Sequence, residues 1–371
     1  MTADVLVIGA GIVGAFIAAA LAQQGQRVHV LSALSPGDGA TAAGMGHLVV
    51  LDDDPAELAL SRWSLALWRQ SGHLASGEYR DCGTLWLATE DHELPALRAK
   101  QQRLQQAGIG CEWLDERTLA IAEPVLRRGL AAGLRVAGDG VIYAPRVARS
   151  LLGDEGRGRI AWAAGATVQR VLPCGVQLAD GRRIGADAIV IAAGLDSARL
   201  LPELRFVPRK GHLAITDRCA LPLRHQVVEV GYGASAHGSA DSIAFNLQPR
   251  PTGQLLIGSC RQVGRDDRAI DAAVFGRMVG RSIHFVPGLA DVPVLRAWTG
   301  VRPGSADGRP CIGRWPLLPG VWVAAGHEGL GITTAPATAQ LLVAQMLGRD
   351  CPIDAAPFDP ARMLLAVEEG V

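Results

Sequence analysis

Three glycines near the N-terminus have the spacing of a dinucleotide-binding loop. Gly9, Gly11 and Gly14 follow the apolar run Val5–Ile8 and open an alanine-rich segment. In such a loop the first glycine allows a tight turn, the second lets the backbone approach a pyrophosphate, and the third lets helix and strand pack closely. The helix N-terminus offers unpaired N–H groups and the positive end of its dipole to the phosphates. The spacing therefore predicts a dinucleotide site.

The residue that follows the second predicted strand departs from this motif. An acidic side chain usually stands there and hydrogen-bonds the adenosine ribose. Here the strand Arg27–Leu31 is followed by Ser32, whose hydroxyl can bond a ribose hydroxyl without the strength of a charge-assisted bond. Ser32 weakens the hypothesis of a nicotinamide-dependent dehydrogenase. It also leaves open a non-catalytic subunit that keeps the fold for assembly.

Three further segments suit an aromatic ring system and a carboxylate. Gly39–Leu48 is rich in small residues against which a flat ring can lie, although a generic glycine-rich loop has the same composition. Trp298–Pro310 contains Arg302, whose planar guanidinium suits two-point binding of a carboxylate. A surface ion pair is the alternative for this arginine. Gly326–Thr333 is a glycine-rich turn that opens the last predicted helix.

The order and spacing of these motifs resemble the D-amino-acid oxidase superfamily of FAD enzymes, which contains glycine oxidase, sarcosine oxidase and several amino-acid dehydrogenases. The likeness covers nearly the whole chain and includes the predicted strand end Ala192–Gly194. Within the superfamily, the stretch Ser242–Ser259 looks most similar to the FAD subunit of bacterial hydroxyproline dehydrogenases.

The resemblance implies where FAD would bind. The N-terminal glycines would hold the pyrophosphate, Ser32 the ribose and Val168 the adenine, while the later segments would line the flavin. The last helix would direct its positive end at the ring edge where negative charge develops on reduction. No cysteine stands just before the Arg302 loop, so we expect non-covalent FAD. The implied cofactor-binding residues are Gly9, Gly11, Val13, Gly14, Ser32, Thr41, Ala42, Gly44, Met45, Val168, Ala193, Gly194, Gly329, Leu330, Gly331 and Ile332.

The resemblance also implies residues that act on the substrate. Arg302 would bind the substrate carboxylate, and Met45 and His47 would lie beside the flavin and the substrate. A histidine that only makes structural hydrogen bonds near the cofactor is an equal alternative for His47. Tyr232 and His237 fall in the predicted substrate domain, where relatives contribute an active-site tyrosine, but the local pattern assigns neither.

The expected reaction is oxidation of an α-amino or imino acid to the imine, with hydride transfer to flavin N5. By resemblance, the substrate would be cis-4-hydroxy-D-proline or a related D-proline derivative, and the chain would be the catalytic subunit of a hetero-oligomeric dehydrogenase. Partner subunits would then carry a second flavin and an iron–sulfur cluster, because the seven cysteines of this chain are scattered. The alternative is a self-sufficient oxidase of glycine, sarcosine or D-amino acids that uses oxygen.

Composition excludes several other classes of protein. A formal net charge of zero and the lack of a basic run argue against a nucleic-acid partner. The dispersed cysteines show no metal-ligand spacing and fit a bacterial cytoplasm, with peripheral contact to the inner membrane through an electron acceptor as an alternative. Val5–Ala22 carries no charge, but three glycines interrupt it and Asp4 precedes it. We therefore expect neither a transmembrane segment nor a signal peptide there.

The motifs at the two chain ends need a parallel sheet to bring them together. Val5–Ile8, the helix Ile12–Gln24 and Arg27–Leu31 have the length of a βαβ unit. Ala188–Gly194 and Gly320–Gly326 are further apolar runs that end in glycine, and a helix is predicted over residues 334–347. We therefore predict an α/β fold with a doubly wound, Rossmann-like FAD-binding domain.

A second domain is predicted between these pieces. Gly83–Ala88, Gly211–Thr216 and Gly253–Gly258 are short apolar segments bounded by turn residues, which predicts a mainly antiparallel sheet. The charged stretch Glu93–Gln106 predicts an exposed helix, so this domain is of the α+β class. The FAD-binding domain is placed at residues 1–75, 140–205 and 298–371, and the substrate domain at residues 76–139 and 206–297.

Overall fold

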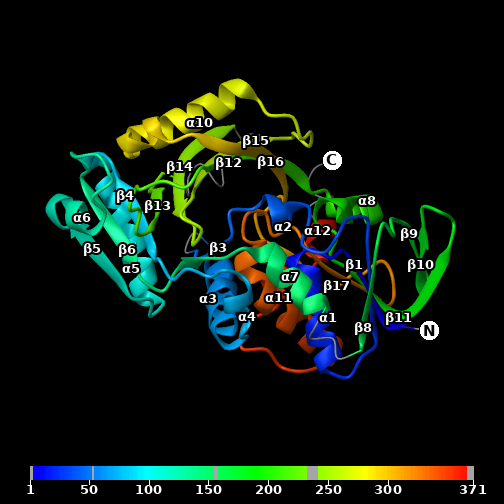
Figure 1. The fold of residues 1–371 in the computed structure, drawn as a ribbon. Helices are drawn as coiled ribbons and strands as arrows, with labels where there is room; N and C mark the ends of the chain where they lie inside the picture. Colours follow the sequence, from blue (N-terminus) through cyan, green and yellow to red (C-terminus); the bar gives the residue numbers. More distant parts are fainter. Residues whose placement is uncertain (1–2, 52–53, 154–157, 232–240, 366–371) are drawn as a thin grey trace.

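Two large β-sheets form the framework of the computed structural model, which describes residues 3–51, 54–153, 158–231 and 241–365 (Figure 1). The first sheet has the strand order β17-β18-β11-β1-β2-β8, and its neighbouring strands are parallel except for β17 and β18. These strands are β1 (Ala3–Ile8), β2 (Val28–Ser32), β8 (Ile160–Ala164), β11 (Arg183–Ile191), β17 (Cys311–Arg314) and β18 (Val321–Ala325). Strands from the start, middle and end of the chain lie side by side, which confirms the predicted α/β fold.

Strand β1 is apolar because both of its faces are buried. Val5 and Val7 pack in one core, and Leu6 and Ile8 pack in another on the opposite side of the sheet. The first face is covered by α1 (Ile12–Gln23), α3 (Pro55–Gln70), α7 (Ala144–Gly153) and α11 (Gly331–Met346). The second face is covered by the hairpin β9 (Val168–Leu172) and β10 (Gly175–Leu178) with the short helices α8 (Ser197–Leu200) and α12 (Arg362–Leu365).

The second sheet has the strand order β16-β12-β15-β14-β13-β4-β6-β5. All neighbouring pairs are antiparallel except β13 and β4, which confirms the prediction of a mainly antiparallel sheet. The strands are β4 (Thr84–Ala88), β5 (Cys111–Asp115), β6 (Ala132–Val136), β12 (Val207–Thr216), β13 (Gln226–Glu229), β14 (Ser242–Pro249), β15 (Leu255–Val263) and β16 (Val294–Gly304).

Alternation along β14 separates an apolar face of this sheet from a polar one. Phe245 and Leu247 pack under α10 (Ala272–Phe285), where Phe245 stacks on Phe285 with ring centroids 4.2 Å apart. Asn246 and Gln248 alternate with them and point to the opposite face. Helix α10 lies on the outer side of the sheet, and α2 and α3 lie on the other side (Figure 1). The polar face therefore looks toward the predicted FAD-binding domain.

Shorter elements connect the two sheets. Strand β3 (His47–Leu48) pairs with β7 (Gly140–Val141) in a two-stranded sheet. The remaining helices are α2 (Ala40–Ala43), α4 (His73–Ser76), α5 (Leu94–Gln106) and α6 (Glu116–Ala122). The 3-10 helices are η1 (Asp91–Glu93), η2 (Gly194–Asp196), η3 (Pro202–Leu204), η4 (Pro287–Asp291) and η5 (Ala356–Phe358).

We propose that the first sheet with its helices forms the FAD-binding domain and that the second sheet forms the substrate domain. The predicted boundary at residue 298 falls inside β16, which pairs with β12 of the second sheet from Val294 to Gly304. Arg302 thus extends from the substrate-domain sheet.

Within the described ranges no helix is both long and apolar enough to cross a membrane. The uncharged segment Val5–Ala22 is divided between β1 and α1.

Candidate functional site

The N-terminal glycines bring β1, α1 and the end of β11 into close contact. Gly9 has a φ of +114°, and a Cβ atom added there would lie 2.3 Å from the Ala192 carbonyl oxygen. A Cβ atom added at Gly14 would lie 2.0 Å from the Gly9 carbonyl oxygen. Gly11 is the N-cap residue of α1, and no side chain of its own caps the helix. The first turn of α1 therefore presents backbone N–H groups at the carboxyl edge of the sheet.

Helix α2 is fastened to the start of α1. The Ile12 N–H donates a hydrogen bond of 3.0 Å to Thr41 Oγ1, which is buried. A Cβ atom added at Gly44 would lie 3.1 Å from Ile332 Cδ1, so the loop after α2 also touches the start of α11. Ala42 lies in α2 beside Thr41. The segments predicted to hold the pyrophosphate and the flavin thus meet at one place.

Helix α11 begins at Gly331 without a side-chain cap. Its first N–H groups therefore have no partner inside the helix. A Cβ atom added at Gly331 would lie 3.9 Å from Val13 Cγ2, so the N-termini of α11 and α1 are neighbours. Gly329 is exposed and lies next to the Arg302 side chain, and Leu330 is half-buried.

The predicted adenosine-binding residues lie at the same edge of the first sheet. Ser32 Oγ accepts a hydrogen bond of 3.2 Å from the Leu34 N–H, which leaves the hydroxyl hydrogen available as a donor. The Ala166 N–H donates to the Ser32 carbonyl oxygen, and β9 starts two residues later at Val168. Ala193 follows β11 directly, and Gly194 has a φ of +59°.

These residues fit an FAD molecule. The N-termini of two helices meet at one place, and neither N-cap residue, Gly11 or Leu330, caps its helix with its own side chain. Apart from the Ile12 N–H, which Thr41 accepts, their first N–H groups are the donors that phosphates and an electron-rich ring edge require. Side chains larger than glycine have no room at Gly9 and Gly14. We propose that FAD binds along this edge.

Arg302 lies across the polar face of the second sheet. Its Nη1 donates a hydrogen bond of 3.3 Å to the Cys260 carbonyl oxygen, and its Nη2 lies 2.8 Å from where a Cβ atom of Gly211 would stand. In the described part of the chain no carboxylate lies within ion-pairing distance of Arg302. Most of its donors are therefore available to a substrate carboxylate.

Met45 connects the loop after α2 to the second sheet. It is buried with Leu213 and Leu256, and Trp298 packs against this small cluster. A Cβ atom added at Gly258 would lie 2.7 Å from Met45 Sδ. Met45 therefore forms part of the wall between the flavin loop and the sheet that carries Arg302.

Three carboxamide side chains surround His47, and two of them hydrogen-bond its ring. His47 Nδ1 lies 2.7 Å from Gln226 Oε1, and Asn246 Nδ2 lies 3.3 Å from His47 Nε2. These partners assign the ring proton to Nδ1 and the lone pair to Nε2. Gln248 Nε2 lies 2.8 Å from the protonated Nδ1, and we assign its hydrogen bond to Gln226 Oε1 at 3.0 Å. Both ring nitrogens are therefore engaged within the protein, which favours the structural alternative for His47.

Burial keeps this histidine neutral. Loss of solvation is the main cause that lowers the pKa of His47 to about 4; the hydrogen bond to Gln226 opposes the shift, and the charges of Arg302 and Arg250 add to it. Arg250 is itself buried. A neutral imidazole does not attract the substrate carboxylate away from Arg302, and its one lone pair, on Nε2, already accepts from Asn246.

The carboxamide cluster continues to a buried acid. Gln226 Nε2 donates to Thr84 Oγ1, and Thr84 Oγ1 donates to Asp139 Oδ2, each at 2.6 Å. The Val50 N–H donates to the other oxygen of Asp139. Burial raises the pKa of Asp139 to about 7 despite these bonds.

The sequence analysis did not predict the carboxamide side chains of Gln226, Asn246 and Gln248 as part of the site. Tyr232 and His237 lie outside the residues that the structure describes. Asn246 and Gln248 stand two residues apart in an otherwise apolar segment, a pattern that indicates a strand with one polar buried face. Gln226 carries no such signal. The described residues contain no group of three or more histidine, cysteine, aspartate or glutamate side chains that could hold a metal ion.

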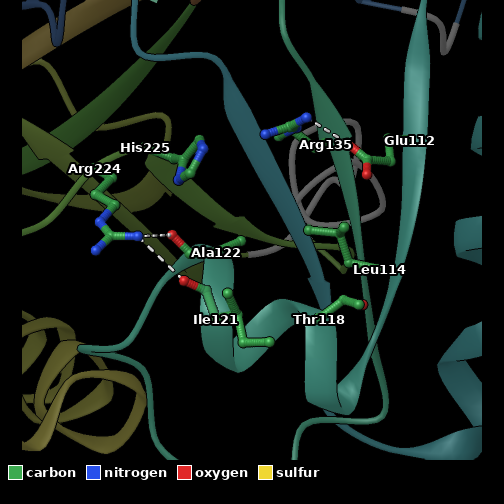
Figure 2. A pocket seen from close by; sticks show the side chains of 8 residues that line it. All are labelled: Glu112, Leu114, Thr118, Ile121, Ala122, Arg135, Arg224 and His225. Carbon is green, nitrogen blue, oxygen red and sulfur yellow. Dashed lines mark hydrogen bonds and ion pairs between the residues drawn. The ribbon is translucent and has the colours of Figure 1, made fainter.

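A pocket of about 470 Å³ lies at the opposite end of the second sheet from β16. Figure 2 shows that both of its arginines have local partners, because Arg224 donates to two carbonyl oxygens of α6 and Arg135 pairs with Glu112. It contains none of the predicted site residues. Its lining is Glu112, Leu114, Thr118, Ile121, Ala122, Arg135, Arg224 and His225.

Comparison with known proteins agrees with this geometry. The profile of the family described as "FAD dependent oxidoreductase" (DAO) matches residues 4–345. The chain is 30% identical to the glycine oxidase of Pseudomonas aeruginosa over 98% of this chain and 100% of that protein. It is 29% identical to a D-amino acid dehydrogenase of Cereibacter sphaeroides over 80% of this chain and 68% of that protein. The crystal structure of glycine oxidase from Geobacillus kaustophilus superposes with a TM-score of 0.88 at 26% identity, covering 97% of this chain and 99% of that chain.

These matches also decide between the earlier hypotheses. A family defined by FAD replaces the nicotinamide-dependent alternative, and the full-length similarity to glycine oxidase favours the oxidase alternative over the hydroxyproline dehydrogenase subunit. Because the family profile spans most of the chain, the protein belongs to the DAO family of FAD-dependent oxidoreductases.

Proposed function

We propose that this chain oxidises the C–N bond of a small amino or imino acid to an imine and passes the electrons to oxygen without a partner subunit. In the overall reaction, the α-carbon and the nitrogen each lose one hydrogen, and oxygen takes up both with two electrons to form hydrogen peroxide. The observation that carries the proposal is the half-buried Arg302, whose donors are mostly unused and whose side chain lies beside Gly329, just before the start of α11. The similarity to glycine oxidases along the full length supports the oxidase form.

The chain's own residues bind and orient the substrate in this proposal. Arg302 binds the carboxylate, and its planar guanidinium fixes the direction of the α-carbon. Met45 and the carboxamide cluster around His47 line the proposed substrate site on the side of the second sheet. FAD, when bound, supplies the two-electron acceptor. His47 acts as a positioning residue, because a neutral ring with both nitrogens engaged is a poor base.

We propose that FAD is held without a covalent bond. Cys260 is the cysteine whose backbone touches Arg302, but its sulfur accepts from the His212 N–H at 3.1 Å and lies 3.2 Å from His212 Nδ1. Denaturing the yellow protein with acid should release all of the flavin into the supernatant. Flavin that stays with the pellet would contradict this assignment.

The experiment that tests the function compares two acceptors on the purified chain. Glycine, sarcosine, D-alanine and the D- and L-forms of proline and 4-hydroxyproline are first tested anaerobically for bleaching of the flavin. With the substrates that bleach it, hydrogen peroxide in air is then compared with reduction of an artificial dye. Peroxide formed at the rate of substrate loss supports the oxidase.

The rival is the catalytic subunit of a hetero-oligomeric dehydrogenase that acts on cis-4-hydroxy-D-proline or a related D-proline derivative. The similarity to a D-amino acid dehydrogenase keeps the dehydrogenase class in view. Fast dye reduction with little peroxide, confined to proline derivatives, would favour this rival. A chain that binds FAD but is bleached by no amino or imino acid would overturn both.

A further inference from the structure

Glu328 attaches the turn before α11 to the second sheet at two points. Its backbone N–H donates a hydrogen bond of 3.0 Å to the carbonyl oxygen of Pro303, which follows Arg302 on β16. Its carboxylate reaches toward β15, where Arg261 Nη2 lies 2.7 Å from Oε1. The same oxygen lies 3.7 Å from Nη1 of Arg209 on β12, the strand between those two. Glu328 therefore interacts with three neighbouring strands.

Two points of attachment fix the orientation of the turn as well as its place. Because β12 separates β15 from β16, the two outer strands lie about 10 Å apart. The backbone bond alone would hold the turn at β16 and allow it to rotate about that strand. The ion pair between Glu328 and Arg261 removes this rotation.

The residues on either side of Glu328 connect the turn to the proposed site. His327 Nε2 lies 3.0 Å from Thr338 Oγ1 of α11, and both side chains are buried. A Cβ atom added at Gly329 would lie 3.9 Å from Cδ of Arg302. A shift of Glu328 would therefore change the position of Arg302 relative to the start of α11.

The backbone of Glu328 is held in an unfavourable conformation. Its φ of +47° lies in the left-handed region, which a residue with a Cβ atom rarely adopts. Burial raises the pKa of Glu328, but the charges of Arg302 and the two arginines named above outweigh burial and lower it. The carboxylate is therefore ionised, and its ion pair with Arg261 opposes the backbone strain.

We propose that Glu328 is a positioning residue: through its ion pair with Arg261 it sets the place of Arg302 relative to the start of α11, and so aligns the substrate with the flavin. This inference rests on the proposed function, because it takes Arg302 as the carboxylate-binding residue and the start of α11 as part of the flavin site. A misplacement of about 1 Å in such a site lowers the rate on the order of 100-fold.

The first test measures the rate of flavin reduction at saturating glycine, D-alanine or D-proline by anaerobic stopped-flow mixing. Glu328→Gln and Arg261→Gln break the same ion pair from its two sides, and each should lower this rate on the order of 10- to 100-fold. Glu328→Gly adopts the left-handed backbone without strain but lacks the carboxylate, so it should be slow as well. A wild-type rate in any of these variants would overturn the proposal, and Arg261→Gln decides it even if the Glu328 variants do not fold.

Acetate binding tests the same residues without turnover. Acetate is titrated into the FAD-loaded protein while the flavin absorbance is recorded. It should bind about 2- to 10-fold more tightly to Glu328→Gln, which lacks a negative charge near Arg302, and less tightly by a similar factor to Arg261→Gln, which lacks a positive one. A general loss of structure would weaken binding in both variants. Weaker acetate binding in Glu328→Gln would therefore overturn the positioning role.

Glu78 provides the matched control. It also has a left-handed backbone, with a φ of +52°, and its Oε1 lies 2.6 Å from Nη1 of Arg146 in α7. Glu78→Gln should change neither the rate of flavin reduction nor the acetate affinity. Equal losses of rate in Glu78→Gln and Glu328→Gln would overturn the assignment to Glu328 and leave the proposed function standing. If no amino or imino acid bleaches the flavin of the wild-type protein, the proposed function itself is wrong and this inference fails with it.

Discussion

The hydroxyl oxygen of Thr41 accepts a hydrogen bond from the backbone N–H of Ile12 at 3.0 Å, across 29 residues of sequence. Ile12 is the first residue of α1, so a side chain from the predicted flavin loop caps the helix that is proposed to hold the pyrophosphate. The cap satisfies one of the N–H groups that a helix start leaves unpaired. The two halves of the cofactor site are thereby joined by one buried hydrogen bond.

Thr41→Val should weaken FAD retention and lower the free energy of unfolding by about 1 kcal/mol, because the cap is lost while the shape is kept. The ratio of flavin to protein absorbance after gel filtration and the melting temperature of the apoprotein measure the two effects. Thr41→Ser keeps the oxygen and is the matched control. Normal FAD retention in the valine variant would show that the cap does not order the site.

Gly14→Ala should lower the free energy of unfolding by at least about 2 kcal/mol, the order expected for overpacking, because the methyl group would overlap the Gly9 carbonyl oxygen. The expected flavin content of the purified variant is also low, since β1 and α1 must separate. Thermal denaturation and flavin absorbance measure the two effects.

The control for this substitution is another glycine inside a helix. A Cβ atom added at Gly280, exposed in α10, would have no heavy atom within 4 Å. Gly280→Ala should therefore stabilise the protein by about 0.5–1 kcal/mol, because alanine has the better helix propensity. Equal behaviour of the two variants would show that helix propensity, and not the contact with Gly9, decides the effect at Gly14.

The first sheet was predictable because its signals are local. A continuous apolar run ending in glycine marks a parallel strand buried on both faces, and β1, β11 and β18 all have this form. The glycine spacing at Gly9–Gly14 follows from contacts within one βαβ unit. These features need no knowledge of distant parts of the chain.

The carboxamide cluster was not predictable because its contacts are long-range. His47 and Gln226 are 179 residues apart, and only the register of β13 and β14 brings Gln226 beside Gln248. The place of Arg302 over Gly211 has the same origin, since it follows from the pairing of β12 with β16. A single sequence shows these residues as separate polar positions, and their combined chemistry appears only after folding.

Arg302→Ala should lower kcat/KM for amino-acid oxidation on the order of 100-fold or more. The substitution removes the charged, two-point hydrogen bond to the substrate carboxylate, which contributes a few kcal/mol of binding free energy. Arg302→Lys should recover only part of this loss, since an ammonium cannot make the same planar contact. Flavin content should stay at the wild-type level, which steady-state kinetics on protein matched by absorbance at the flavin band can establish. Wild-type kinetics in the alanine variant would remove Arg302 from the substrate site.

His47→Gln should make the protein less sensitive to acid. The pKa of His47 is lowered to about 4 in the folded chain, from 6.5 in the ordinary side chain. Its contribution to stability is therefore complete above pH 6.5 and is lost as the pH falls toward 4, by about 3 kcal/mol in total. Melting temperatures between pH 7 and pH 4 should fall less steeply in the variant. Parallel curves for variant and wild type would show that His47 does not remain neutral in the fold.

The stability contribution of Asp139 should depend on pH in the opposite sense to that of His47, and Asp139→Asn tests this. Burial raises the pKa of Asp139 to about 7 from the ordinary 3.8, so the folded chain holds a proton there that the unfolded chain has released. Stability is then full below pH 3.8 and falls as the pH rises toward 7, by about 4 kcal/mol in total. Asparagine keeps one carbonyl oxygen as acceptor for the Val50 N–H and can donate its amide N–H to Thr84 Oγ1, but it cannot ionise. The stability advantage of the wild type over the variant should therefore shrink between pH 4 and pH 8.

The exposed Asp291 provides the control, because Asp291→Asn removes a carboxylate that lies in solvent. Urea or thermal unfolding of the three proteins at pH 5 and pH 8 separates the cases. If the stability difference from the wild type changes with pH only for Asp139→Asn, Asp139 is protonated in the folded protein. The hydrogen-bonded chain from Asp139 through Thr84 and Gln226 to His47 is then neutral throughout. If the stability differences are the same at both pH values, Asp139 is ionised in the fold. The cluster then places a negative charge behind the substrate carboxylate, and the electrostatic case for Arg302 as its binding partner is weaker.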